Sequence, residues 1–141
     1  MDALKPTLVI LNPWSGRGRG AKARGQVERG LKESGAAFEL VETTGPGHAT
    51  GLARDAAAAG VTRLLVAGGD GTIHDVVNWL MRVPLADDGA TSAAVGLIPL
   101  GTGNDFAKLV GIYKQPPEVA AVRMMRASED RFDLGFALGE Y

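Results

Sequence analysis

Two glycine-rich stretches hold the residues of this sequence that could do chemistry. They are GGDGT at residues 68–72 and PLGTGND at residues 99–105. Glycine lets backbone N–H groups approach an anion closely, and the hydroxyls of Thr72 and Thr102 can donate further hydrogen bonds, which indicates phosphate. Asp70 would repel a bare phosphate. It fits such a site if Mg²⁺ lies between the two charges, or if its carboxylate takes a proton from an attacking hydroxyl.

Two further turns have the same character, namely NPWSGRGRG at residues 12–20 and TTGPGHA at residues 43–49. Any strand-to-helix turn uses glycine, serine, threonine or asparagine for capping and for positive φ. Asp70 itself could be a helix N-cap, with Ile73 at the third helical position. One turn therefore decides little, but four turns that meet at one edge of a sheet favour a ligand site.

Alternating strands and helices are predicted to position these turns. Buried strands follow from short apolar runs, and helices from apolar residues at helical spacing. The predicted strands are Thr7–Leu11, Phe38–Glu42, Arg63–Ala67, Ala94–Ile98 and Arg131–Leu138. The predicted helices contain Ala23, Val27 and Leu31 after the first glycine loop, then Thr50–Ala59, Asp70–Arg82, a short stretch from Asp105, and Pro117 to about Arg126. This alternation predicts an α/β fold with three layers (α/β/α) and a mainly parallel sheet, in which ligands bind beyond the carboxyl ends of the strands.

The composition narrows the class of protein. A chain of 141 residues suits one domain, and its net charge of −1 argues against a nucleic-acid binder, which would carry a basic surface. There is no cysteine, so neither a disulfide framework nor a thiolate metal site can form. No apolar run resembles a signal peptide or approaches the ~18 residues of a membrane span. These features predict a cytoplasmic protein whose membrane contact, if any, is peripheral and at the inner face.

The glycine turns match neither common nucleotide loop, because no G-x-x-x-x-G-K-[ST] is present and no G-x-G-x-x-G follows a strand. GGDGT, together with NPWSG at 12–16 and PLGTGNDFA at 99–107, instead resembles the catalytic domain of the diacylglycerol kinase and sphingosine kinase superfamily, above all its bacterial soluble lipid kinases. The resemblance runs from about Pro6 to Gly135. GGDGT alone would also fit NAD kinases and phosphofructokinases, and GTGNDFA is the more specific motif. The resemblance implies an NAD kinase/phosphofructokinase-like N-terminal domain.

The resemblance also implies an activity: a kinase that uses ATP and Mg²⁺ to phosphorylate the free hydroxyl of a lipid such as diacylglycerol. By position, Asp70 is the expected catalytic residue, acting as a base or through the metal. The expected nucleotide-binding residues are Asn12, Gly16, Thr43, Gly68, Gly69, Gly71, Thr72, Gly101 and Thr102. Asn104 and Asp105 are expected to support the site structurally rather than to react. Asp133 is expected to lie where the chain passes into a second domain.

That second domain, rich in β-structure, follows the nucleotide-binding domain in the family and is expected to hold the metal ligands and much of the lipid site. Residues 1–141 are therefore expected to be the nucleotide-binding domain alone, able to bind nucleotide but close to inactive in isolation. The sequence does not identify which lipid is phosphorylated. Peripheral membrane contact is expected. Met124 and Met125 are expected to lie in the core, and a homodimer could cover any part of that surface that the second domain would otherwise cover.

Three points are left open by the sequence. One alternative function is an NAD kinase-like phosphotransferase, and another is a non-catalytic nucleotide-binding module. His74-Asp75 stands where many relatives have Asn-Glu, and Trp79 where glycine is common. A basic run in and after the first turn is either solvated or in contact with ATP phosphates or anionic lipid headgroups; it comprises Arg17, Arg19, Lys22 and Arg24.

Overall fold

The structure is a computed structural model and describes residues 5–82 and 93–130. Its order of elements follows the sequence prediction closely. The predicted strand Arg131–Leu138, Asp133 and the polar segment 84–92 lie outside the described residues.

Four parallel strands form the sheet within the described residues. They are β1 (Thr7–Leu11), β2 (Phe38–Glu42), β3 (Arg63–Gly68) and β4 (Ala94–Pro99), in the spatial order β2-β1-β3-β4. Each neighbouring pair runs parallel, with Leu8 beside Leu64 and Leu65 beside Gly96. The inner strands β1 and β3 are almost wholly buried. This explains why both read as unbroken apolar runs, since a strand covered on both faces has no polar side.

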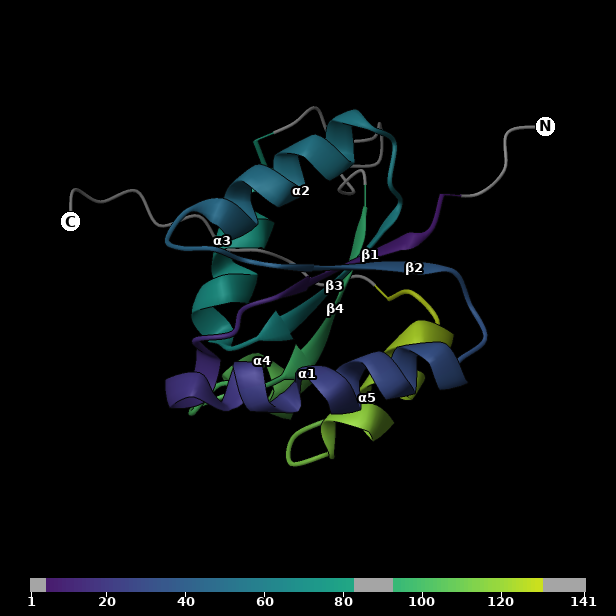
Figure 1. Cartoon of the computed structure of the whole chain (residues 1–141). Coiled ribbons are helices and arrows are strands. Elements are labelled where there is room, and N and C mark those ends of the chain that lie inside the picture. Colours follow the sequence, from purple (N-terminus) through teal and green to yellow (C-terminus); the bar gives the residue numbers. More distant parts are fainter. Residues whose placement is uncertain (1–4, 83–92, 131–141) are drawn as a thin grey trace.

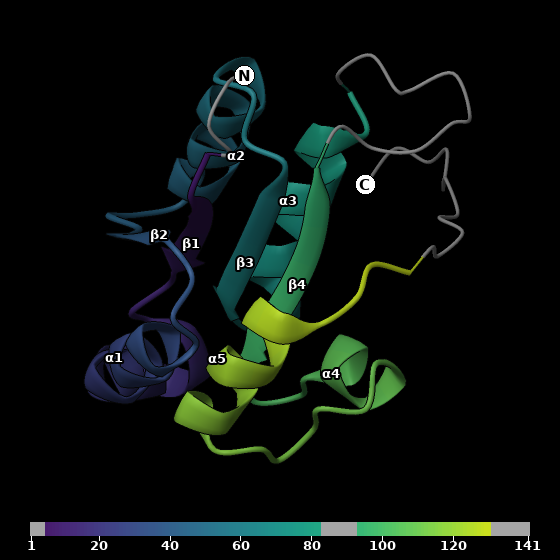
Figure 2. The same ribbon diagram turned by 90° about the vertical axis from the view of Figure 1, so that its right-hand side faces the viewer.

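Helices cover both faces of the sheet. They are α1 (Ser15–Glu33), α2 (His48–Ala58), α3 (Asp70–Leu80), α4 (Asp105–Leu109) and α5 (Pro117–Arg126). α1 packs against α5 on one face and α2 packs against α3 on the other, so that the sheet lies between two helix pairs (Figure 1; Figure 2 shows it from the side). The three-layer α/β/α prediction is confirmed.

Gly30 allows the backbones of α1 and α5 to pack close together. A Cβ atom built on Gly30 would lie 2.3 Å from the backbone oxygen of Glu118 and 2.8 Å from the Cβ of Ala121. Only a residue without a side chain allows this approach. Beside it, Val27 and Leu31 are fully buried, as their helical spacing predicted.

The start of α1 differs from the prediction of a glycine loop followed by a helix. α1 begins at Ser15, but Gly16, Arg17 and Gly18 have φ values of 62°, 61° and 90°, which are not helical. The loop therefore exists as a left-handed interruption inside the first turns of α1. The other helix boundaries differ by two residues or fewer: α2 begins at His48, and α3 ends at Leu80.

Candidate functional site

The carboxyl ends of the parallel strands place the predicted turns along one edge of the sheet. The first turn follows β1, the second follows β2, the third links β3 to α3, and the fourth links β4 to α4. Ligands bind at this edge in open α/β sheets. The four turns thus meet as the sequence predicted.

Asn12 joins the first turn to the third. Its Nδ2 donates a hydrogen bond to Thr72 Oγ1 at 3.0 Å, and its Oδ1 accepts one from the backbone N–H of Trp14 at 3.0 Å. Gly68 lies against the same group, because a Cβ there would be 3.0 Å from Thr72 Oγ1 and 3.2 Å from Ser15 Oγ. The hydroxyl of Thr72 is therefore held in a fixed place, with its proton free to point toward a bound group.

The carboxylate of Asp70 closes the start of α4. Its Oδ2 accepts the backbone N–H of Asp105 at 2.9 Å, and its Oδ1 accepts that of Phe106 at 3.1 Å. The N-cap of α3 itself is Gly69, so the alternative in which Asp70 caps its own helix is wrong. It caps a different helix instead, where a carboxylate satisfies N–H groups that have no partner inside the helix.

The third and fourth turns touch backbone to backbone. A Cβ on Gly101 would lie 2.6 Å from the Cα of Gly69, and a Cβ on Gly69 would lie 3.1 Å from the Cα of Gly101. Asn104 holds the fourth turn in shape: its Oδ1 accepts the N–H of Gly101 at 3.0 Å and its Nδ2 donates to Gly101 O at 2.8 Å. This close approach thus requires glycine at 101, and a side chain at 69 would be tightly packed against the fourth turn.

A hollow of about 420 Å³ lies beside the first three turns. Its lining includes Asn12, Trp14, Thr43, Thr44, Thr72 and Asp75. The helices α2 and α3 begin at its wall, and a helix N-terminus favours an anion. The hollow therefore combines threonine hydroxyls, glycine backbone and helix N-termini, the groups that suit a polyphosphate.

The hollow gathers only part of the predicted set. Thr43 and Thr72 line it and are 5% and 6% exposed. Gly16 lies away from it, with a would-be Cβ 2.3 Å from the backbone oxygen of Leu100. Thr102 lines a separate cleft on the other side of the turns. Gly71 is exposed and has open space around it, so its backbone is accessible.

Sequence reasoning missed three features of the site. Trp14 and Asp75 line the hollow although neither was a predicted site residue; Trp14 is 59% exposed, an unusual state for a tryptophan. Both residues lie inside or directly after the glycine-rich motifs, in NPWSG and in GGDGTIHD, and this position was the sequence signal that could have identified them. The bond from Asp70 to α4 had no signal in the local sequence, because it joins residues that are 35 and 36 positions apart.

A metal centre made of protein side chains alone is not among the described residues, which contain no group of three or more His, Cys, Asp or Glu side chains able to hold an ion. Asp75 is the carboxylate in the lining of the hollow. Mg²⁺ usually takes one or two carboxylates together with water and substrate phosphate oxygens. These residues fit an ion that arrives with a phosphate ligand.

Comparison with known proteins identifies the family. The sequence model of the family described as the diacylglycerol kinase catalytic domain matches residues 6–137. The chain belongs to this family. It is 37% identical over 138 residues to a protein named diacylglycerol kinase from Bacillus subtilis (strain 168), covering 98% of this chain and 44% of that protein. It is 29% identical over 126 residues to sphingosine kinase B of Dictyostelium discoideum, covering 89% of this chain and 16% of that protein.

Solved structures confirm the fold. A crystal structure of a diacylglycerol kinase from Bacillus anthracis str. Sterne superposes with a TM-score of 0.71 at 24% identity, covering 90% of this chain and 46% of that one. The chain therefore shares the α/β fold of this solved kinase structure, as the resemblance implied. This diacylglycerol kinase-family chain spans less than half the length of the relatives named here. Within its described residues, no helix combines the length and the apolar character needed to cross a bilayer.

Proposed function

We propose that this chain is the nucleotide-binding part of an ATP-dependent lipid kinase and that ATP binds in the hollow beside the first three turns. The observation that carries the proposal is the Asn12–Thr72 hydrogen bond, which holds a threonine hydroxyl at the start of α3 in a hollow also lined by Thr43. In phosphoryl transfer the protein mainly positions the phosphates and stabilises charge. Fixed hydroxyls, accessible glycine backbone and two helix N-termini serve that purpose.

The parts of the site would act as follows. Thr72 and the backbone of Gly71 would bind the phosphates, and Thr43 would contact the nucleotide from the second turn. Mg²⁺ would arrive with ATP, neutralise phosphate charge, and meet Asp75 at the wall of the hollow. Asp70 was expected to be the catalytic residue. Because both of its oxygens accept N–H groups of α4, we propose that it works by positioning the third and fourth turns.

The substrate and location of the whole protein belong to the same proposal. We propose a lipid with a free hydroxyl, such as diacylglycerol, reached by peripheral contact at the cytoplasmic face of the membrane. The family membership supports this choice over an NAD kinase-like phosphotransferase or a module that only binds nucleotide. We propose further that the isolated chain binds ATP with little turnover of lipid; a homodimer stays a proposal as well.

Calorimetric titration of the chain with ATP, with and without Mg²⁺, tests the nucleotide site. We expect ATP to bind and Mg²⁺ to tighten the binding. Thr72→Val should weaken it roughly tenfold, because the hydroxyl is lost and the amide of Asn12 loses its partner. The matched control is Thr102→Val, which removes a hydroxyl outside the hollow and should leave ATP affinity unchanged.

Three outcomes would count against the proposal. Absence of ATP binding by the wild-type chain would remove its direct support. Equal losses in Thr72→Val and Thr102→Val would place the nucleotide elsewhere, provided that both variants melt like the wild type by circular dichroism. Preferential binding of NAD over ATP would favour the NAD kinase-like alternative.

A further inference from the structure

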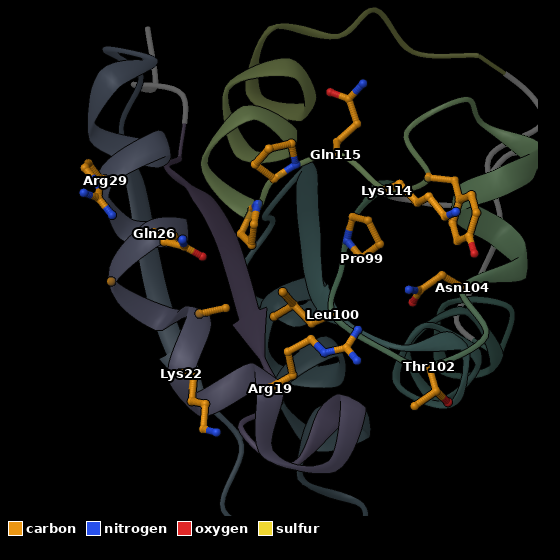
Figure 3. Close-up of a pocket in the computed structure, with 15 residues that line it drawn as sticks. Arg19, Lys22, Gln26, Arg29, Pro99, Leu100, Thr102, Asn104, Lys114 and Gln115 are labelled. Atoms are coloured by element: carbon orange, nitrogen blue, oxygen red, sulfur yellow. The ribbon is translucent and has the colours of Figure 1, made fainter.

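A second and larger cleft lies across the turns from the nucleotide hollow. Its volume is about 740 Å³, and it is bounded by α1, by the fourth turn and by the segment 113–117 that leads into α5 (Figure 3). The hollow, by contrast, is lined by the second turn and by the first residues of α2 and α3, the helix pair on the opposite face of the sheet. The two cavities have no described lining residue in common, although the first turn contributes Asn12 and Trp14 to the hollow and Arg19 to the cleft.

The charges in this cleft are all of one sign. Arg19, Lys22 and Arg29 line it from α1 and Lys114 from the opposite wall, and among the residues that the structure describes no aspartate or glutamate is part of the lining. The whole chain has a net charge of −1, so four unopposed cations in one cleft are a local concentration of positive charge. Such a cleft raises the local concentration of an anion.

The basic run of the sequence is divided by the fold. Arg24 turns away to β2, where its Nη1 lies 2.7 Å from Glu42 Oε1; the hydrogen bond and the charge of Glu42 raise the pKa of Arg24. Arg19, Lys22 and Arg29 line the cleft instead, and within residues 5–82 and 93–130 none of the three has an ion pair. In Figure 3 the side chain of Arg19 reaches across the cleft, whereas those of Lys22 and Arg29 point away from its centre. On the opposite wall, Lys114 Nζ lies 5.5 Å from the centre of the Tyr113 ring. Arg19 is thus the cation best placed to meet a ligand.

Polar groups face Arg19 across the cleft. In Figure 3, Arg19 reaches from α1 toward the fourth turn, which carries Thr102 and Asn104. A guanidinium opposite a hydroxyl and an amide is a combination that binds the oxygens of a phosphate group, with the guanidinium able to form two parallel hydrogen bonds. Leu100 and Pro99 supply an apolar floor.

We propose that this basic cleft binds the phosphate group of a second ligand, distinct from the nucleotide in the hollow. Two sources present the same chemistry, namely a dissolved phosphate compound and the headgroup of an anionic lipid. The fourth turn lines the cleft at Thr102 and touches the third turn at Gly101 and Gly69, so a ligand here would also contact the turn that braces the nucleotide site. The inference goes beyond the proposed function, because the cleft is separate from the hollow.

The test for a dissolved phosphate is calorimetric titration with pyrophosphate, alone and in the presence of ATP. The cleft variant is Arg19→Gln with Lys114→Gln. The control is Lys32→Gln with Arg54→Gln, which removes the same charge from exposed side chains outside the cleft. We expect pyrophosphate to bind with ATP present, and the cleft variant to bind it roughly tenfold more weakly while the control matches the wild type.

The test for a lipid headgroup uses the same variants in co-sedimentation with vesicles of phosphatidylcholine, with and without phosphatidylglycerol. If the cleft variant, but not the control, loses binding to the anionic vesicles, the ligand is a lipid headgroup. If the cleft variant loses only pyrophosphate binding, the ligand is a dissolved phosphate compound. The proposal is overturned if the wild type binds neither probe, if cleft and control variants behave alike, or if ATP displaces pyrophosphate. If the chain fails to bind ATP, the proposed nucleotide site is refuted. The comparisons of the cleft variant with the control, in pyrophosphate binding and in vesicle binding, still test the cleft.

Discussion

Replacing Gly101 with alanine is expected to lower the free energy of unfolding by about 1–3 kcal/mol, since overpacking that forces backbone to move costs this much. The new Cβ would lie 2.6 Å from the Cα of Gly69 and 2.9 Å from Asn104 Oδ1. The first of these atoms belongs to the backbone of the third turn, so no side-chain rotation relieves the clash. The third and fourth turns must separate, and urea unfolding followed by circular dichroism measures the cost.

Gly71→Ala is the matched control for this prediction. A Cβ at Gly71 has nothing within 4 Å, and the residue lies in the first turn of α3, where alanine is favoured over glycine. Its stability should equal or slightly exceed that of the wild type. An unchanged unfolding midpoint in Gly101→Ala would show that the two turns do not depend on this close approach.

Asp70→Asn is expected to cost about 0.5–2 kcal/mol of stability, the range for loss of a helix N-cap. An asparagine can accept the N–H of Asp105 or that of Phe106, but its amide group then faces the other N–H as a second donor. Part of α4 should loosen. Hydrogen exchange of the two backbone amides, followed by NMR, reports this loosening directly, and both amides should exchange faster in the variant.

The control for Asp70→Asn is Asp55→Asn, which removes a carboxylate that is 72% exposed and paired only with its neighbour Arg54. Neither stability nor exchange in α4 should change there. If the amides of residues 105 and 106 exchange at the wild-type rate in Asp70→Asn, the positioning role is refuted. A role for the Asp70 carboxylate in chemistry would then regain support.

The strands and helices were predictable because their signals are local. An unbroken apolar run such as Leu64–Ala67 reveals a strand buried on both faces, and Val27 and Leu31 at helical spacing reveal the buried side of α1. The motifs also predicted that Asn12 and Thr72 would share a site, and they are hydrogen-bonded. What the sequence predicted well depends on neighbours within a few positions.

The rest of the site depends on residues far apart in the chain. The contact of Gly69 with Gly101 and the capping of α4 by Asp70 exist only after the strands have taken their order. A glycine in a turn looks the same in sequence whether it faces a phosphate or another backbone. The sequence assigned Thr102 to the nucleotide, and in the fold Thr102 lines the basic cleft, so its contact with the nucleotide stays a prediction.

The strand order β2-β1-β3-β4 also suits a chain that is made from its N-terminus onward. β1 is synthesised first and becomes an inner strand; β2 then adds to one of its edges and β3 to the other. β4 adds to β3, which has already emerged. Each strand after the first therefore meets a partner among residues already translated, and β1 and β3 each keep one edge open only until the next strand of the described sheet has been made. Parallel pairings of long range fold slowly and leave edges open to aggregation, so in the described sheet this order lets each new strand pair as soon as it emerges.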